Sequence, residues 1–187
     1  MAPEWARPTT IQHWPGKSVQ NRNKVDTLIA YSSGREAPVT WGFFIDKDDP
    51  GELDVQSLFK LYLDPTFEDQ SRHRPSLEEA RKWFTDYLRF IYNAINEHFD
   101  DSYARWRSRR VEFLFSVPTT WKHPAMIAET RKLIRQAGFG DQAHHTVQIS
   151  LTEAEAAAVC VSKQGYAKGD VFLICDAAEV ARLMSTF

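Results

Sequence analysis

Histidine and aspartate side chains in the second half of the chain are of the types that bind metal ions. His144 and His145 are adjacent, and His123 and Asp141 lie near them in the sequence. Imidazole nitrogens and carboxylate oxygens are common zinc ligands. However, adjacent histidines point in different directions on most backbones, and no partner follows at the spacing of a metal-binding motif. We therefore favour the interpretation that no metal is bound directly.

A basic and aromatic segment, Arg105-Trp106-Arg107-Ser108-Arg109-Arg110, has the composition that binds phosphates and stacks nucleic-acid bases. The segment is short, and the formal net charge of -2 gives no general attraction to nucleic acid or anionic membranes. The alternative is a solvated linker, or arginine stems packed against Trp106. We favour this alternative and expect no nucleic-acid partner and no membrane partner.

Covalent chemistry has no recognisable motif, because neither a Gly-x-Ser-x-Gly elbow nor a Cys–His arrangement is present. Cys160 and Cys175 each lie in an apolar run, which predicts buried thiols in a reducing compartment.

The N-terminus has no apolar signal core, and no apolar run approaches the roughly 20 residues of a membrane span. We predict a soluble, intracellular protein, either cytoplasmic or nuclear.

Three strands are predicted in the first half of the chain. They cover Ile11–Trp14, Val25–Tyr31 and Val39–Ile45, and turn signals follow the first two. Asp46–Leu53 is predicted to be an acidic loop, and Leu58–Leu63 is an ambiguous apolar stretch. With 187 residues, 43% of them hydrophobic, the chain has material for one domain, or one domain plus a fragment, with a sizeable core.

A long amphipathic helix is predicted over about 76–100, because Ser76 and Glu79 have capping-box spacing and apolar residues then recur every three or four positions. A buried strand follows at Val111–Val117.

A helix then runs from Pro124 to a C-terminal cap at Gly138. The next elements are a strand at Val147–Leu151, a helix over 152–162 opened by a second capping box, and a strand at Val171–Cys175. This order predicts an α/β fold with a mixed sheet covered by helices.

Four ordered segments of the second half resemble the nucleotide-binding domain of the heat shock protein 70 family. They are Phe115-Ser116-Val117-Pro118-Thr119-Thr120-Trp121, Ala137-Gly138-Phe139, Thr152-Glu153-Ala154-Glu155-Ala156-Ala157-Ala158 and Val171-Phe172-Leu173-Ile174-Cys175-Asp176. In the first half, Trp14-Pro15-Gly16, Lys24-Val25-Asp26-Thr27, Trp41-Gly42-Phe43 and Phe59-Lys60-Leu61 are similar to the divergent, fungal-type branch, although Asp26 stands where proline is usual. The resemblance covers roughly residues 10–176. It implies the first lobe of an actin-like ATPase with a ribonuclease-H-like fold.

The resemblance also implies chemistry: the family binds ATP and Mg and couples ATP hydrolysis to protein folding. Its phosphate loops need glycines, because backbone amides must approach phosphate oxygens closely. The first loop, Asp-x-Gly-Thr-Thr, is absent from this sequence. The second should read Asp-x-Gly-Gly-Gly-Thr, but Asp176 is followed by Ala177-Ala178-Glu179. We therefore expect an inactive chain that binds neither ATP nor Mg.

Three positions match catalytic or nucleotide-binding residues of the family. Asp176 matches an acid that orients metal-bound water, or it is a loop carboxylate. Glu153 matches a carboxylate near the metal, or it is a first-turn acid favoured by the helix dipole. Lys60 stands where the family keeps a lysine facing the γ-phosphate, or it is a solvated lysine. Pro118 matches an allosteric relay proline, or it simply ends a strand.

The expected organisation is a lead-in at 1–10, an incomplete lobe at 11–170, the first strand of a second lobe at 171–176 and a divergent tail at 177–187. The pattern is truncated at both ends relative to the family. Co-chaperone or client proteins are the partners that the resemblance implies. A lobe that lacks interior strands would expose apolar surface and unpaired strand edges, which predicts a marginal or self-associating chain.

Overall fold

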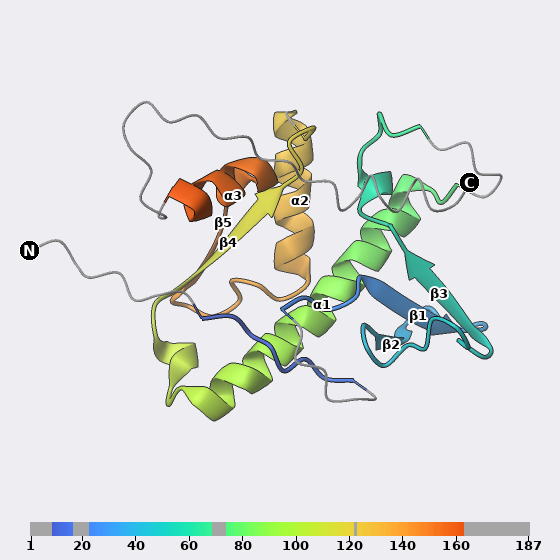
Figure 1. Ribbon diagram of the computed structural model, residues 1–187, viewed down its shortest axis with the longest axis horizontal. Helices are drawn as coiled ribbons and strands as arrows, with labels where there is room; N and C mark the ends of the chain where they lie inside the picture. Colours follow the sequence, from blue (N-terminus) through green and yellow to red (C-terminus); the bar gives the residue numbers. More distant parts are fainter. Residues whose placement is uncertain (1–8, 17–22, 69–73, 122, 163–187) are drawn as a thin grey trace, which may run out of the picture. The chain divides into compact units, whose positions relative to one another are not determined.

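The computed structural model describes residues 9–16, 23–68, 74–121 and 123–162. They form a mixture of helices and small sheets, which confirms the α/β class (Figure 1). The chain divides into two compact units. The first contains the residues up to Trp106 together with Gln136–Gly138, and the second contains Arg107–Arg135 and the residues from Phe139 onward.

The first unit is built on an antiparallel sheet with the order β2-β1-β3. Its strands are β1 (Leu28–Ser32), β2 (Pro38–Trp41) and β3 (Leu53–Ser57), and the short helix η1 (Leu61–Leu63) follows. The β3 strand lies where the sequence predicted the end of an acidic loop and the residues after it. Its alternation of Leu53 and Val55 with polar residues is the period of a half-buried strand, and Leu53 and Val55 pack on the buried residues of β1.

The predicted strand at Ile11–Trp14 is wrong, because the described sheets contain no strand there. The chain instead makes an isolated parallel bridge between Gly16 and Phe43. A Cβ atom at Gly16 would lie 2.5 Å from the Cβ atom of Phe43, so only glycine allows this approach. The other two strand predictions in this half have the right location, with shorter strands than expected.

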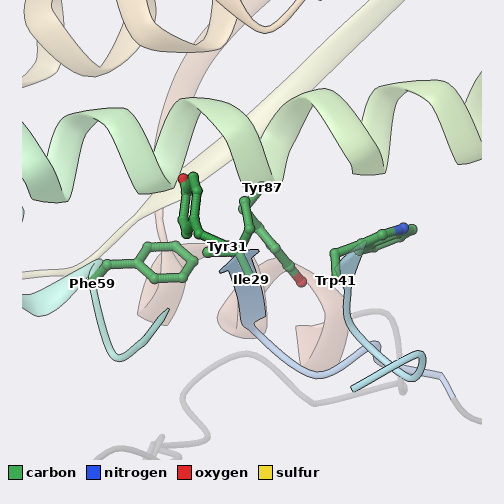
Figure 2. Close-up of a cluster of buried hydrophobic side chains, with 5 residues drawn as sticks. All are labelled: Ile29, Tyr31, Trp41, Phe59 and Tyr87. Atoms are coloured by element: carbon green, nitrogen blue, oxygen red, sulfur yellow. The ribbon is translucent and has the colours of Figure 1, made fainter. Parts of the chain in front are cut away.

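Helix α1 (Leu77–Ser102) covers the first sheet and confirms the predicted long helix. Its capping box is formed, because Ser76 Oγ accepts from the Glu79 amide at 3.1 Å and the Ser76 amide donates to Glu79 Oε2 at 2.8 Å. Figure 2 shows the core beneath the helix. It consists of Ile29, Tyr31, Trp41, Phe59 and Tyr87.

The second unit is built on a parallel pair of strands, β4 (Val111–Val117) and β5 (His145–Thr152). Helix α2 (Pro124–Gln136) connects them, and α3 (Glu153–Ser162) follows β5. Gly138 has a φ of 111°, as the predicted C-terminal cap of α2 requires. The 3-10 helix η2 (Trp106–Ser108) lies at the division between the units.

The described strands therefore lie in two separate sheets and not in one mixed sheet. Local patterns predict strands but not which strands pair, so this difference was invisible in the sequence. The predicted buried strand at Val111–Val117 is buried on one face only. Phe113 and Phe115 each make an edge-to-face contact with Phe139 at 5.1 Å, whereas Leu114 is 65% exposed.

Candidate functional site

The carboxyl ends of β4 and β5 meet at one edge of the parallel sheet. The register pairs Val117 with Thr152, so Pro118 and Glu153 each follow directly after a strand at that edge. Loops at the carboxyl ends of parallel strands are where α/β folds bind ligands. The described residues therefore bring together two of the four positions that the resemblance singles out.

Pro118 ends β4 and begins the turn toward α2. Its carbonyl accepts a hydrogen bond from the Trp121 amide at 3.0 Å. Trp121 is only 5% exposed, so the end of this turn is buried. This geometry is that of a strand terminator, and a relay role for Pro118 stays a prediction.

Glu153 is the first residue of α3 and is partly buried. The second predicted capping box is formed beside it. The Thr152 amide donates to Glu155 Oε2 at 2.7 Å, and the Glu155 amide donates to Thr152 Oγ1 at 3.2 Å. The Thr152 amide and hydroxyl both donate to Glu155 Oε2, and these two hydrogen bonds lower the pKa of Glu155 below its ordinary value. Glu153 thus has the position of a first-turn acid, where the helix dipole favours a negative charge.

Lys60 lies in the first unit, immediately before η1, with a helical backbone at φ -61° and ψ -35°. Glu153 lies in the second unit. Asp176, and the residues that replace the second phosphate loop, lie outside the described residues. An ATP-type site formed by Lys60, Glu153 and Asp176 therefore stays a prediction from the resemblance.

A charged cluster on α1, which the sequence analysis missed, lies against β1. Asp86 is buried, and both of its carboxylate oxygens accept hydrogen bonds. Oδ2 accepts from Tyr31 Oη and Lys82 Nζ, and Oδ1 accepts from Arg89 Nη1, each at 2.9 Å. Lys82 Nζ also lies 4.3 Å from the centroid of the Tyr31 ring and donates to the Glu36 carbonyl at 2.5 Å.

The chemistry of this cluster is that of a structural clamp. Burial, and then the hydrogen bond to Asp86, raise the pKa of the Tyr31 hydroxyl far above its ordinary value. Tyr31 therefore stays a neutral donor, and the Asp86 carboxylate is balanced by two cations. The spacing of Lys82, Asp86 and Arg89 on one helical face was visible in the sequence. Nothing in the sequence indicated Tyr31 as their partner.

The described residues also bear on the two other chemistries considered from the sequence, metal binding and stacking of nucleic-acid bases. Within residues 9–16, 23–68, 74–121 and 123–162, no group of three or more His, Cys, Asp or Glu side chains could hold a metal ion. Trp106 is only 3% exposed and donates through Nε1 to Asp100 Oδ1 at 2.7 Å, so its ring cannot stack a nucleic-acid base.

The prediction that Cys160 is buried is wrong, because its place on α3 leaves it exposed; Cys175 lies outside the described residues. Among the helices that the structure describes, none combines the length and apolar character needed to cross a bilayer.

Comparison of this chain with protein-family models, with curated proteins and with solved structures finds no match. The similarity to the heat shock protein 70 family therefore rests on the ordered sequence segments alone.

Proposed function

We propose that this chain is a divergent first lobe of an actin-like ATPase of the heat-shock-70 type that does not itself bind or hydrolyse ATP. One observation carries the assignment to this type of lobe. Three of the four resembling segments of the second half coincide with element boundaries in the parallel β4–α2–β5–α3 arrangement, and the fourth lies outside the described residues. Phe115–Trp121 contains the end of β4, Ala137–Phe139 follows α2, and Thr152 caps α3.

The loss of activity follows from the sequence after Asp176. Ala178, Glu179 and Val180 stand where the motif of the family has three glycines. A side chain at these positions is expected to keep the backbone amides away from phosphate oxygens. In the alignment with the motif of the family, Glu179 puts a carboxylate at the second glycine position. Two like charges at contact distance in a partly desolvated site cost on the order of several kcal/mol. ATP and Mg are therefore cofactors of the family and not of this chain.

Isothermal titration of the chain with Mg-ATP tests this proposal. We expect no binding heat at ATP concentrations of up to about 1 mM, the weak end of ordinary nucleotide affinities. Micromolar binding that the substitution Asp176→Asn removes would contradict the proposal, because it would locate a working site at the predicted acid. Binding heat that persists in the Asp176→Asn variant would also contradict the proposal, because it would mean that ATP binds at a different site.

A second candidate function is protein association through the sheet of the second unit. Among the described residues, β4 and β5 pair only with each other, so the outer edge of each strand has no strand partner. Parallel sheets are normally covered on both faces, and two strands alone are marginal. Leu114 on β4 is 65% exposed and Val159 on α3 is 48% exposed. These features favour self-association or a protein partner, such as the clients or co-chaperones that the resemblance implies.

Analytical ultracentrifugation of the chain and of the variant Leu114→Lys tests this candidate. We expect the unsubstituted chain to associate at tens of micromolar, a weak-interface concentration, and the variant to remain monomeric, because a lysine blocks edge association. The matched control is Val39→Lys, which changes an apolar residue of β2 that is 40% exposed. Association that is unchanged in Leu114→Lys, or lost equally in both variants, would contradict a site on the second unit.

A further inference from the structure

A cavity of about 520 Å³ in the first unit follows the length of β3. The four consecutive residues Asp54–Ser57 line it. Successive side chains of a strand point to opposite faces of the sheet, so a cavity that touches four residues in a row runs along the edge of the strand. Within the described residues β3 pairs with β1 alone. The backbone amides and carbonyls of its other edge therefore have no strand partner and lie beside the cavity.

The opposite wall of the cavity comes from α1 and the segments near it. Glu79 and Trp83 contribute from the first turns of the helix, Arg74 from the segment before it, and Tyr62 from η1. An open strand edge that faces a helix across a groove is the geometry in which an extended peptide adds to a sheet as a further strand. Main-chain hydrogen bonds then supply affinity, and the wall selects side chains.

The charged residues that line the cavity favour binding of a cation. Asp54 and Glu79 carry two negative charges, and Arg74 carries one positive charge, so the ionisable lining has a net charge of -1. Asp54 Oδ1 already accepts from Gln56 Nε2 at 2.7 Å, and Glu79 Oε2 accepts from Ser76. Each carboxylate has a second oxygen that can accept from a ligand. Trp83 and Tyr62 also line the cavity, and aromatic rings of these types attract ammonium and guanidinium groups.

We propose that the groove between β3 and α1 binds an extended peptide segment that pairs with the edge of β3 and places a lysine or arginine side chain against Asp54, Glu79 and Trp83. The peptide is a segment of a protein partner. This site lies wholly in the first unit, and the proposal stands independently of the ATPase origin of the chain and of association through the second unit.

The test is a titration of the full-length, ¹⁵N-labelled chain with the peptide acetyl-Thr-Val-Lys-Val-Thr-amide, followed by amide chemical shifts. We expect shifts in the amides of Asp54–Ser57 and in the indole of Trp83. A peptide with glutamate in place of lysine should bind about fivefold more weakly, as expected for a partly exposed charge. A peptide N-methylated at alternate amides should not bind, because it cannot pair with a strand edge.

Variants of the wall sharpen the test through the sign of their effects. Asp54→Asn and Glu79→Gln should each weaken binding of the lysine peptide about two- to fivefold, and Arg74→Gln should strengthen it by a similar factor. Glutamine at position 79 keeps the capping box, so α1 stays intact. The matched controls are Glu52→Gln and Glu78→Gln, which remove exposed carboxylates that do not line the cavity. They should change the affinity by less than about 1.5-fold.

Several outcomes would overturn the proposal. The first is the absence of shifts at about 5 mM peptide, a concentration at which even millimolar binding is visible. Tighter binding of the glutamate peptide, or weaker binding in Arg74→Gln, would mean that the site selects acidic ligands. Equal binding of acetyl-lysine methylamide would mean that a cation binds without strand pairing. Concentration-dependent shifts of Asp54–Ser57 without peptide would identify a second copy of the chain as the occupant.

Discussion

The sheets of the two units differ in how completely their faces are covered. In the first unit, α1 covers one face of the sheet, and aromatic side chains fill the space between them. Among them, Trp41 stacks on Phe90 with ring centroids 5.7 Å apart. In the second, Phe139 packs on Phe113 and Phe115 on one face of β4, and Leu114 on the other face is 65% exposed. The core of the first unit is therefore closed by its own helix. The second unit has an exposed apolar face of the kind that another element or molecule usually covers.

This difference predicts that substitutions in the two units change different properties of the chain. Aromatic side chains that are fully buried stabilise a fold, whereas an exposed apolar residue contributes little to the fold and favours contacts with other molecules. Substitutions in the first unit should therefore change the free energy of unfolding, and substitutions on the exposed face of the second should change association.

The largest expected effect is that of Phe59→Ala. Phe59 is fully buried, and its ring centroid lies 5.7 Å from that of Tyr87. We expect the free energy of unfolding to fall by about 3–5 kcal/mol, because a large cavity replaces the ring. Urea denaturation followed by circular dichroism measures this loss. The control is Phe44→Ala in the same unit, where 38% of the residue is exposed and the loss should be about 1 kcal/mol or less. Equal losses would contradict the idea of a closed core around Phe59.

The second prediction concerns the clamp between α1 and β1. Asp86→Ala should lower the free energy of unfolding by about 2 kcal/mol, because it removes charge-assisted hydrogen bonds from Tyr31, Lys82 and Arg89. Lys82 and Arg89 are 43% and 50% exposed in their side chains, so water partly compensates them. The effects of Asp86→Ala and Tyr31→Phe should not add in the double variant, since the two residues share a bond. Simple additivity would show that the Tyr31 hydroxyl does not depend on Asp86.

Elements with a local signal could be predicted from the sequence, and elements without one could not. Ser76 with Glu79, and Thr152 with Glu155, formed the expected capping boxes because a capping box is complete within four residues. The strand at β3 was missed because it is short and follows a turn-rich acidic loop. The supposed strand at Ile11–Trp14 failed because partners elsewhere in the chain decide whether a short apolar segment joins a sheet.

The candidate site was less predictable than the fold. Lys82, Asp86 and Arg89 are neighbours on one helix, but Tyr31 lies 55 positions from Asp86, and only folding brings them together. The edge groove combines β3 with α1 in the same way. Lys60 and Glu153 were predicted from the resemblance, which supplies roles but no geometry for this chain.

The third prediction uses the raised pKa values of two tyrosines in the first unit. Burial is the main cause for both, and it raises the pKa of Tyr87 to about 12 and that of Tyr31 further. Above pH 10 an unfolded chain loses these protons and the folded chain keeps them. The free energy of unfolding should therefore fall as the pH rises, by at most about 1.4 kcal/mol per pH unit for each tyrosine.

Urea denaturation at pH 9, 10 and 11 measures this slope, and Tyr31→Phe with Tyr87→Phe is the comparison variant. The variant should lose less stability between pH 9 and 11 than the unsubstituted chain. An unchanged slope would mean that groups outside this core, in either unit, control the alkaline unfolding.

The smallest expected effects compare the two capping boxes, one in each unit. Ser76→Ala removes an acceptor of the Glu79 amide and should lower the free energy of unfolding by about 1 kcal/mol. Thr152→Ala makes the equivalent change at α3, which has an exposed outer surface. We expect faster amide hydrogen exchange confined to α3, because a helix with few buried contacts opens locally.

The capping residues Ser76 and Thr152 donate hydrogen bonds to Glu79 and Glu155, and these bonds lower the pKa of both carboxyl groups. Both boxes should therefore stabilise their helices above the ordinary glutamate pKa of about 4.3 and lose this contribution as the pH falls through the lowered values. Exchange rates at pH 3 and 6, corrected for intrinsic chemistry, measure the loss, and Glu79→Gln should remove the pH dependence at α1. Equal global destabilisation by Ser76→Ala and Thr152→Ala would contradict the contrast between a closed first unit and an open second one.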